Sequence, residues 1–231
     1  MDNIVIATIK EWNILNYFKL KEKYQKEFNF YLITDKNELT KEYIKELNPK
    51  YIFFPHWSWI IPDNIYLNVE SIVFHMTDLP YGRGGSPFQN LIVEEQYKTK
   101  ISALKVENGL DTGDIYIKED FDISIGSAEE NFIHLSDIIF NKMIPEIITS
   151  NISPKKQIGK AVTFKRRTSL DSNIELIEKK SLLKFYDFIR MLDAEGYPKA
   201  YFQLDNLKIE FSEVHLKNNK LVGRFEVIIN E

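Results

Sequence analysis

The chain has 231 residues, of which 44% are hydrophobic and 28% charged, an ordinary balance for a globular protein with a sizeable core. Its formal net charge is −4, so it lacks the overall basic excess that binding to a nucleic-acid backbone requires. It contains no cysteine, which excludes disulfides and thiolate chemistry.

No apolar run reaches the length of a membrane-spanning helix, and the first residues lack the basic flank of a secretion signal. We therefore expect a cytoplasmic protein with no membrane partner. Because of the acidic balance, nucleic acid is not an expected partner either.

The first part of the chain alternates short apolar runs with amphipathic segments. The apolar runs have the length of buried strands, and the amphipathic segments are typical of helices that pack by one face. This alternation predicts an α/β fold with a mostly parallel sheet covered on both faces. The predicted strands are residues 3–8, 30–33, 51–54 and 71–74, and the predicted helices between them are residues 14–28 and 38–47.

Capping signals predict where the next helices begin. Ser86 and Pro87 are typical of an N-cap and a first helical residue. Ser127 is followed by acidic residues, which are favourable in the first turn because of the helix dipole. The predicted elements are helices over residues 87–95 and 127–149 and strands over residues 101–106 and 115–123.

A smaller second domain is expected after a linker. Residues 151–160 contain Pro, Ser, Gly and Lys, which is typical of a linker, so we predict domains over residues 1–165 and 166–231. The second is expected to be a small appendage of one helix and an antiparallel sheet. Its predicted elements are a helix over residues 181–192 and strands over residues 201–202, 207–211 and 221–229.

Two segments indicate chemistry. His75 follows a predicted buried strand, so it lies at the edge of the sheet where ligands bind in open α/β folds. Asp111 stands in a later turn with Gly113 and Asp114. A neutral imidazole beside a buried carboxylate makes a general base, because the carboxylate fixes the tautomer and stabilises the imidazolium. Taken singly, a core histidine and a turn-capping aspartate are the ordinary explanations, and only the combination favours a site.

The loop after His75 is rich in glycine. Gly82, Gly84 and Gly85 allow a close approach of the backbone to a ligand. Their spacing matches neither a phosphate-binding P-loop nor the dinucleotide fingerprint, so alone they predict only an irregular loop.

The run Phe-His-Met-Thr-Asp-Leu-Pro-Tyr-Gly-Arg-Gly-Gly-Ser-Pro at residues 74–87, followed by Leu-Asp-Thr-Gly-Asp at residues 110–114, resembles the formyltetrahydrofolate-dependent formyltransferase family. The family pattern is Asn-x-His-x-Ser-x-Leu-Pro-x-x-Arg-Gly and then Leu-Asp-x-Gly. The family includes methionyl-tRNA formyltransferase, glycinamide ribonucleotide transformylase and the sugar N-formyltransferases. The resemblance implies a Rossmann-like catalytic domain, 10-formyltetrahydrofolate as cosubstrate and no metal.

By that resemblance, His75 is the general base that deprotonates an acceptor amine, and Asp111 is the carboxylate that orients it. The amine attacks the formyl carbon, a tetrahedral oxyanion forms, and the proton passes to the leaving folate nitrogen. Leu79-Pro80 matches a prolyl bond that is often cis in the family and shapes the folate pocket.

A short loop after a predicted strand holds one imidazole and two indoles, which is unusual unless the loop lines a pocket, although Trp also fills cores. It stands where the folate-pocket loop of the family begins. The expected folate-binding residues are His56, Trp57, Trp59, Leu79, Pro80, Gly109, Leu110 and Asp114.

Residues after the first strand point to the same crevice. Lys10 is a candidate to bind a phosphate, and it equally fits the first turn of a solvated helix. Arg83 is a candidate to clamp a phosphate or carboxylate, or else to brace backbone carbonyls. The expected sugar-nucleotide-binding residues are Lys10, Trp12, Asn13, Tyr81 and Arg83.

One position departs from the family pattern. The asparagine expected two residues before the histidine is Val73, whose side chain has no hydrogen-bond donor. The loss of one oxyanion donor costs about two to three orders of magnitude in rate. Either another donor replaces it or the protein is impaired. The candidate replacements are His56, Trp57, Trp59, Asn13 and Thr77.

The resemblance is closest to sugar N-formyltransferases, which have a short β-rich appendage. We therefore expect a nucleotide-linked amino sugar as acceptor, a UDP-4-amino-4,6-dideoxy-hexose, in bacterial surface-glycan or nonulosonic (pseudaminic-type) acid synthesis. A homodimer is also possible. The alternatives are a methionyl-tRNA formyltransferase-like enzyme and a folate-binding relative that has lost activity.

Overall fold

The computed structural model describes residues 1–178 and 180–229, which divide into two compact units. The first unit comprises Met1–Arg83, Lys100–Phe121 and Ile133–Thr163. The second comprises Gly84–Thr99, Asp122–Phe132 and Phe164–Glu231.

The predicted boundary near residue 165 falls where the last segment of the second unit begins. The second unit also takes two earlier segments, because both bind the C-terminal part of the chain. Gln89 Nε2 donates to the Met191 carbonyl oxygen at 3.0 Å, and the Glu129 amide donates to the Asp193 carbonyl oxygen at 3.1 Å. The two units are therefore not two continuous stretches of sequence.

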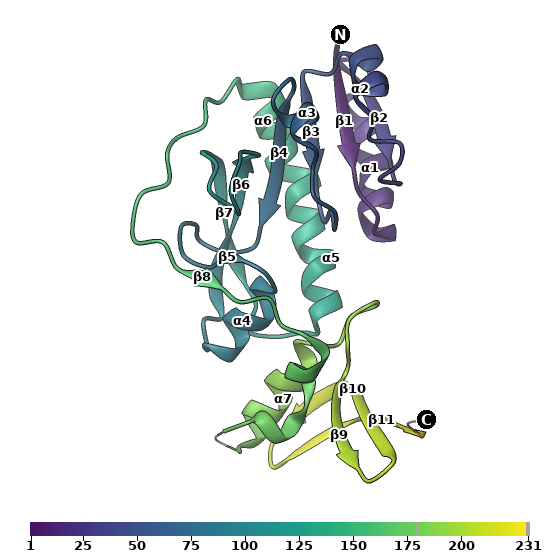
Figure 1. Cartoon of the computed structure of the whole chain (residues 1–231), viewed down its shortest axis with the longest axis vertical. Coiled ribbons are helices and arrows are strands. Elements are labelled where there is room, and N and C mark those ends of the chain that lie inside the picture. Colours follow the sequence, from purple (N-terminus) through teal and green to yellow (C-terminus); the bar gives the residue numbers. More distant parts are fainter. Residues whose placement is uncertain (179, 230–231) are drawn as a thin grey trace. The chain divides into compact units, whose positions relative to one another are not determined.

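Six strands form the main sheet, in the order β2-β1-β3-β4-β6-β7 (Figure 1). The pairs β1–β2, β1–β3 and β3–β4 are parallel, whereas β4–β6 is antiparallel. This confirms the predicted α/β fold with a mostly parallel sheet. The strands are β1 (Asp2–Ala7), β2 (Phe28–Ile33), β3 (Tyr51–Phe54), β4 (Glu70–His75), β6 (Lys98–Lys105) and β7 (Ile115–Asp122).

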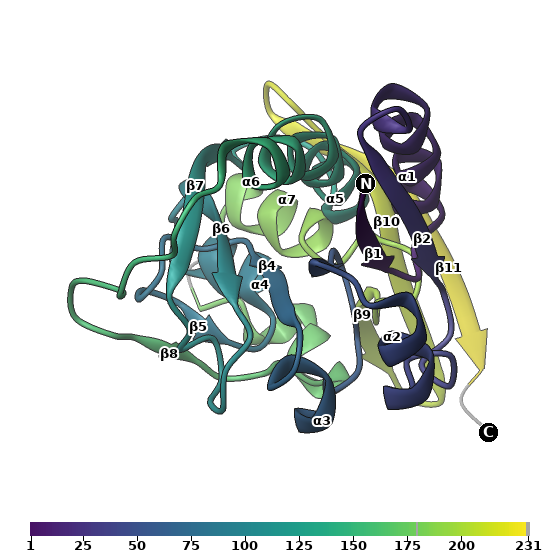
Figure 2. The ribbon, with the colours of Figure 1, turned by 90° about the horizontal axis from the view of Figure 1, so that it is seen from above.

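Helices cover both faces of this sheet. Figure 2 shows α2 (Lys41–Leu47) and α3 (Asp63–Tyr66) on one face, and α1 (Glu11–Tyr24) and α6 (Ile144–Ser150) on the other. The four residues of α3 are too few to show a helical period, so the sequence did not predict this helix.

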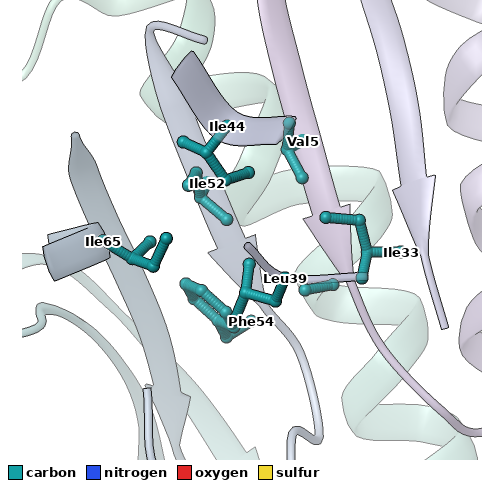
Figure 3. Close-up of a cluster of buried hydrophobic side chains, with 8 residues drawn as sticks. Val5, Ile33, Leu39, Ile44, Ile52, Phe54 and Ile65 are labelled. Atoms are coloured by element: carbon teal, nitrogen blue, oxygen red, sulfur yellow. The ribbon is translucent and has the colours of Figure 1, made fainter. Parts of the chain in front are cut away.

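The face under α2 and α3 is packed with aliphatic side chains and one phenylalanine (Figure 3). None of these side chains is more than 6% exposed. They come from three neighbouring strands, from the two helices and from the loop before α2, and they pack together over the ends of β1 and β3. The members of this cluster are Val5, Ala7, Ile33, Leu39, Ile44, Ile52, Phe54 and Ile65.

The predicted long helix over residues 127–149 has three parts: α5 (Ala128–Ile138), a π-helical turn (Ile139–Met143) and α6. Its start agrees with the prediction, since Ser127 and Glu130 bind each other's backbone amides in a capping box. Pro145, the second residue of α6, lacks an amide hydrogen, which suits the first turn of the segment that follows the π turn.

The second unit contains α4 (Pro87–Val93), α7 (Leu182–Arg190) and a three-stranded antiparallel sheet. The order of that sheet is β11-β10-β9 (Figure 1). These elements confirm the predicted C-terminal helix and antiparallel appendage. The strands are β9 (Ala200–Leu204), β10 (Leu207–Lys217) and β11 (Lys220–Ile229). Shorter elements are β5 (Arg83–Gly84), β8 (Thr163–Phe164) and 3-10 turns over Ser169–Ser172 and Ile174–Leu176.

A buried ion pair holds α7. Arg190 Nε binds Asp187 Oδ1 at 2.7 Å, and the Tyr97 hydroxyl donates to Asp187 Oδ2 at 2.7 Å. Burial and the neighbouring carboxylate raise the pKa of Tyr97 above its ordinary value, so this phenol stays protonated and donates. Across the described residues, no helix is long and apolar enough to cross a membrane.

Candidate active site

His75 is the last residue of β4, at the end of the sheet where β3 also finishes. Its side chain is 10% exposed, and its ring lies between two acceptors. Nε2 is 2.7 Å from the Gly82 carbonyl oxygen, and Nδ1 is 3.6 Å from Asp111 Oδ2. Because a carbonyl oxygen only accepts, Nε2 carries the hydrogen, and the lone pair of the neutral ring is on Nδ1, toward the carboxylate.

Asp111 stands in the loop between β6 and β7, and its backbone has φ 53°. Such a left-handed conformation is uncommon for a residue other than glycine and marks a constrained position. Gly113 explains the constraint, since a Cβ there would lie 1.8 Å from the Lys105 carbonyl oxygen. The close approach of the loop to β6 therefore requires glycine and fixes the position of the carboxylate.

A side chain that the sequence analysis did not select braces this loop. Gln157 Nε2 donates to the carbonyl oxygens of Asp111 and Gly113, both at 2.8 Å. Arg83 donates to Gln157 Oε1 from Nε at 3.1 Å and from Nη2 at 2.7 Å. Of the two roles considered for Arg83, the structure therefore supports bracing, through Gln157. Gln157 lies in the predicted linker, where no local pattern points to a role.

The loop after β3 brings the predicted aromatic residues together. The His56 ring is edge-on to Trp12 at 6.1 Å between centroids, and the Trp57 ring is edge-on to Trp59 at 4.8 Å. Lys10 Nζ lies 5.3 Å from the Trp12 ring centroid, within cation–π range. His56, predicted for folate, thus contacts Trp12, predicted for the acceptor, and Trp57 and Trp59 form a second aromatic pair.

Burial lowers the pKa of His56 to about 4, and the Lys10 charge acts in the same direction. His56 is therefore neutral near pH 7. Its backbone has φ 54°, so the second loop of the site also contains a left-handed residue.

Comparisons with known proteins indicate the family of the chain. The sequence model of the family "Methionyl-tRNA formyltransferase, C-terminal domain" matches residues 169–228. A methionyl-tRNA formyltransferase of Rickettsia felis is 26% identical over 194 residues, which are 80% of this chain and 61% of that protein. The chain therefore spans about three-fifths of the length of this curated relative.

A solved structure titled methionyl-tRNA formyltransferase from Clostridium thermocellum is 51% identical to this chain, with all of both chains covered and a TM-score of 0.96. The chain belongs to the formyltransferase family. A sugar N-formyltransferase from Shewanella shares the fold, with a TM-score of 0.68 and 16% identity over 89% of this chain and 94% of that one.

Val73 stands where the family pattern has an asparagine. Val73 lies beside Phe54 in the β3–β4 register and packs against the apolar cluster under α2 and α3. Because side chains two residues apart on a strand share a face, Val73 and His75 lie on the same face of β4.

The candidate donors differ in what they already bind. Asn13 Nδ2 donates to Thr8 Oγ1 at 2.9 Å, and Thr77 Oγ1 donates to the Gly82 carbonyl oxygen at 3.3 Å. Both therefore hold the fold together. Trp57 Nε1 is buried and has no hydrogen-bond partner in the described part of the chain.

The remaining predicted residues lie in the loops around His75 and Asp111. The Leu79-Pro80 bond is cis, as the resemblance implies, and Leu79 is buried. The Tyr81 amide closes a turn on the Asp78 carbonyl oxygen. Leu110 is 64% exposed, Gly109 has φ 136°, and the Asp114 carbonyl oxygen accepts from the Lys105 amide. Within the described residues, no group of three His, Cys, Asp or Glu side chains is arranged to hold a metal.

Proposed function

We propose that this protein transfers the formyl group of 10-formyltetrahydrofolate to a primary amine. The observation that carries the proposal is the His75 ring with Nδ1 3.6 Å from Asp111 Oδ2, in the motif that resembles the family. The amine nitrogen forms a bond to the formyl carbon while His75 takes its proton. The bond from that carbon to the folate nitrogen then breaks, and the proton passes to that nitrogen.

Methionyl-tRNA is the first candidate acceptor. The support is the C. thermocellum relative, which is 51% identical over its whole length and is named a methionyl-tRNA formyltransferase. A local feature adds to it: residues 151–170 contain six Lys or Arg side chains and no Asp or Glu. This segment, called the basic segment below, suits an acceptor that carries phosphates. A tRNA acceptor would overturn the expectation that nucleic acid is not a partner.

A nucleotide-linked amino sugar, the acceptor expected from the sequence, is the second candidate. The observation that favours it is the formal net charge of −4, because binding to the phosphate backbone of a nucleic acid requires a basic excess, whereas a diphosphate needs only a few local cations. A cationic side chain of the site would bind the diphosphate of the nucleotide sugar, and an aromatic side chain would stack on its base.

The test is a mass-spectrometric assay with the full chain, 10-formyltetrahydrofolate and each acceptor in parallel. We expect one acceptor to gain the mass of a single formyl group, with release of tetrahydrofolate in equal amount. His75→Ala, in the same mixtures, is expected to leave both acceptors unmodified. If the wild-type protein binds the folate but modifies neither acceptor, the protein is the inactive folate-binding relative and the proposal is wrong.

A further inference from the structure

Strand β11 is an edge strand of its sheet with exposed apolar side chains. It is the last strand of its sheet and pairs with β10 alone among the described strands. Phe225 is 64% exposed, Val227 54% and Ile229 67%. On the other face of the strand, Val222 and Ile228 are also exposed. A protein that stays monomeric rarely exposes so many large apolar side chains on one element.

The edge also lacks the usual protection. Natural edge strands are short, or they carry proline, bulges or several lysines that block further pairing. β11 has ten residues and no proline, and Arg224 and Glu226 are the only charged residues within Leu221–Ile229. The bulge of this sheet falls on β10, between Ser212 and His215, so the outer edge of β11 is regular. Its backbone groups are available to another strand.

The sequence of β11 is complementary to itself in one antiparallel register. With Phe225 opposite Phe225 of a second copy, Arg224 of each chain faces Glu226 of the other. The two neighbouring registers are centred on residue 224 or on residue 226. The first places Arg224 opposite Arg224 of the second copy, and the second places Glu226 opposite Glu226. Because opposite charges stabilise a cross-strand pair and like charges destabilise it, the charges select the register centred on Phe225.

The apolar residues agree with the same register. It pairs Leu221 with Ile229 and Val222 with Ile228, and it places Val227 opposite Gly223, so no branched side chain faces a charged one. Within the chain, Glu226 stands opposite Glu210 on β10, an unfavourable pair of like charges. A second Arg224 on the open side of β11 would offset that repulsion.

Phe225 also lines a cavity of its own chain. A cavity of about 280 Å³ is lined by Phe185 and Ile189 of α7 and by Phe211, Leu221 and Phe225 of the sheet. Residues directly opposite in an antiparallel pair point to the same face, so the two Phe225 rings would lie side by side at the rims of both cavities. We propose that two copies of this chain associate through β11 about a two-fold axis at Phe225, which joins their C-terminal sheets into one sheet.

The test is a charge exchange measured by sedimentation equilibrium on the full chain. We expect the wild type to be a dimer. Arg224→Glu and Glu226→Arg each create two like-charge pairs across the axis, and each alone is expected to weaken dimerisation about tenfold or more. Arg224 binds Glu226 at 2.8 Å within the chain as well, but this exposed pair contributes little to folding, so both variants should fold.

Two combinations separate pairing from a general loss of structure. The double variant Arg224→Glu/Glu226→Arg restores opposite charges and is expected to regain the dimer. An equimolar mixture of the two single variants is expected to form a heterodimer, because every cross-strand pair is then Glu with Arg. Lys217→Glu, an exposed charge reversal outside the paired residues, is the control and should leave the dimer unchanged. A wild type that is monomeric, or a dimer that neither single variant weakens, would overturn the proposal.

Discussion

At the scale of single residues, the proposed function depends on an imidazole between two acceptors. The Gly82 carbonyl holds the hydrogen on His75 Nε2, and Asp111 lies where positive charge develops when Nδ1 takes a proton. The ring is therefore positioned before substrate binds, and its tautomer is set by the backbone.

Removal of the imidazole is expected to lower kcat by about two to four orders of magnitude, the usual contribution of a positioned base. Asp111→Asn keeps the shape of the side chain and tolerates the left-handed backbone of that position, so it should fold normally and show a smaller loss of kcat. The measurement is steady-state kinetics with the accepted amine, with folate affinity measured separately. His215→Ala, on an exposed strand position, is the control. Near-normal turnover of His75→Ala would remove the residue from the mechanism.

Trp57→Phe tests whether the unpartnered indole supplies the donor that Val73 lacks. Since Nε1 binds nothing in the described part of the free protein, its removal costs no hydrogen bond, and the free energy of unfolding should stay within about 1 kcal/mol of the wild type. If the indole binds the developing oxyanion, kcat falls about a hundredfold or more, and this is the result we expect. Urea unfolding and kinetics on the same sample distinguish the two effects. Unchanged kcat would assign the donor to another group.

At the scale of elements, apolar periodicity predicted most of the structure. The runs at β1, β3 and β4 are short and apolar, which is typical of buried strands, and their alternation with amphipathic segments predicted the parallel pairing that the structure has. The pairing of His75 with Asp111 was predictable from the family motif alone. Gln157 was not, because its role depends on a linker that returns to the Asp111 loop, and no local pattern encodes that return.

The loop after β3 makes the stability of the protein depend on pH. The pKa of His56 is about 4 in the folded protein and near 6.5 in the unfolded chain, so the unfolded state binds more protons between these values. The contribution of neutral His56 to the free energy of unfolding is therefore fully present above pH 6.5. It is lost as the pH falls toward 4, and the whole loss is about 3 kcal/mol. His56→Asn removes the titrating group and suits the left-handed backbone.

Urea unfolding between pH 7 and pH 4 measures this effect. The difference in unfolding free energy between wild type and His56→Asn is expected to shrink or reverse as the pH falls. Parallel curves for the two proteins would show that His56 titrates normally in the fold.

At the scale of the whole molecule, each compact unit is built from segments that lie far apart in the sequence. Residues Gly84–Thr99 and Asp122–Phe132 join the C-terminal unit because of contacts between distant segments, such as Tyr97 with Asp187, which composition and periodicity do not reveal. Net charge likewise does not show how charges are distributed along the chain. The chain carries −4 overall, yet the basic segment is free of acidic residues.

That local excess makes a prediction about ionic strength. If methionyl-tRNA is the acceptor and the basic segment contacts its phosphates, kcat/KM should fall steeply with salt, because each phosphate contact releases counterions. Replacing Lys155, Lys156 and Lys160 with Gln should then make the slope of log kcat/KM against log salt shallower by about one for each lysine in contact. The control replaces Lys21, Lys23 and Lys26, which are exposed on and just after α1. Equal slopes in both triple variants would exclude the basic segment as the tRNA contact, and a flat wild-type slope would favour the nucleotide sugar.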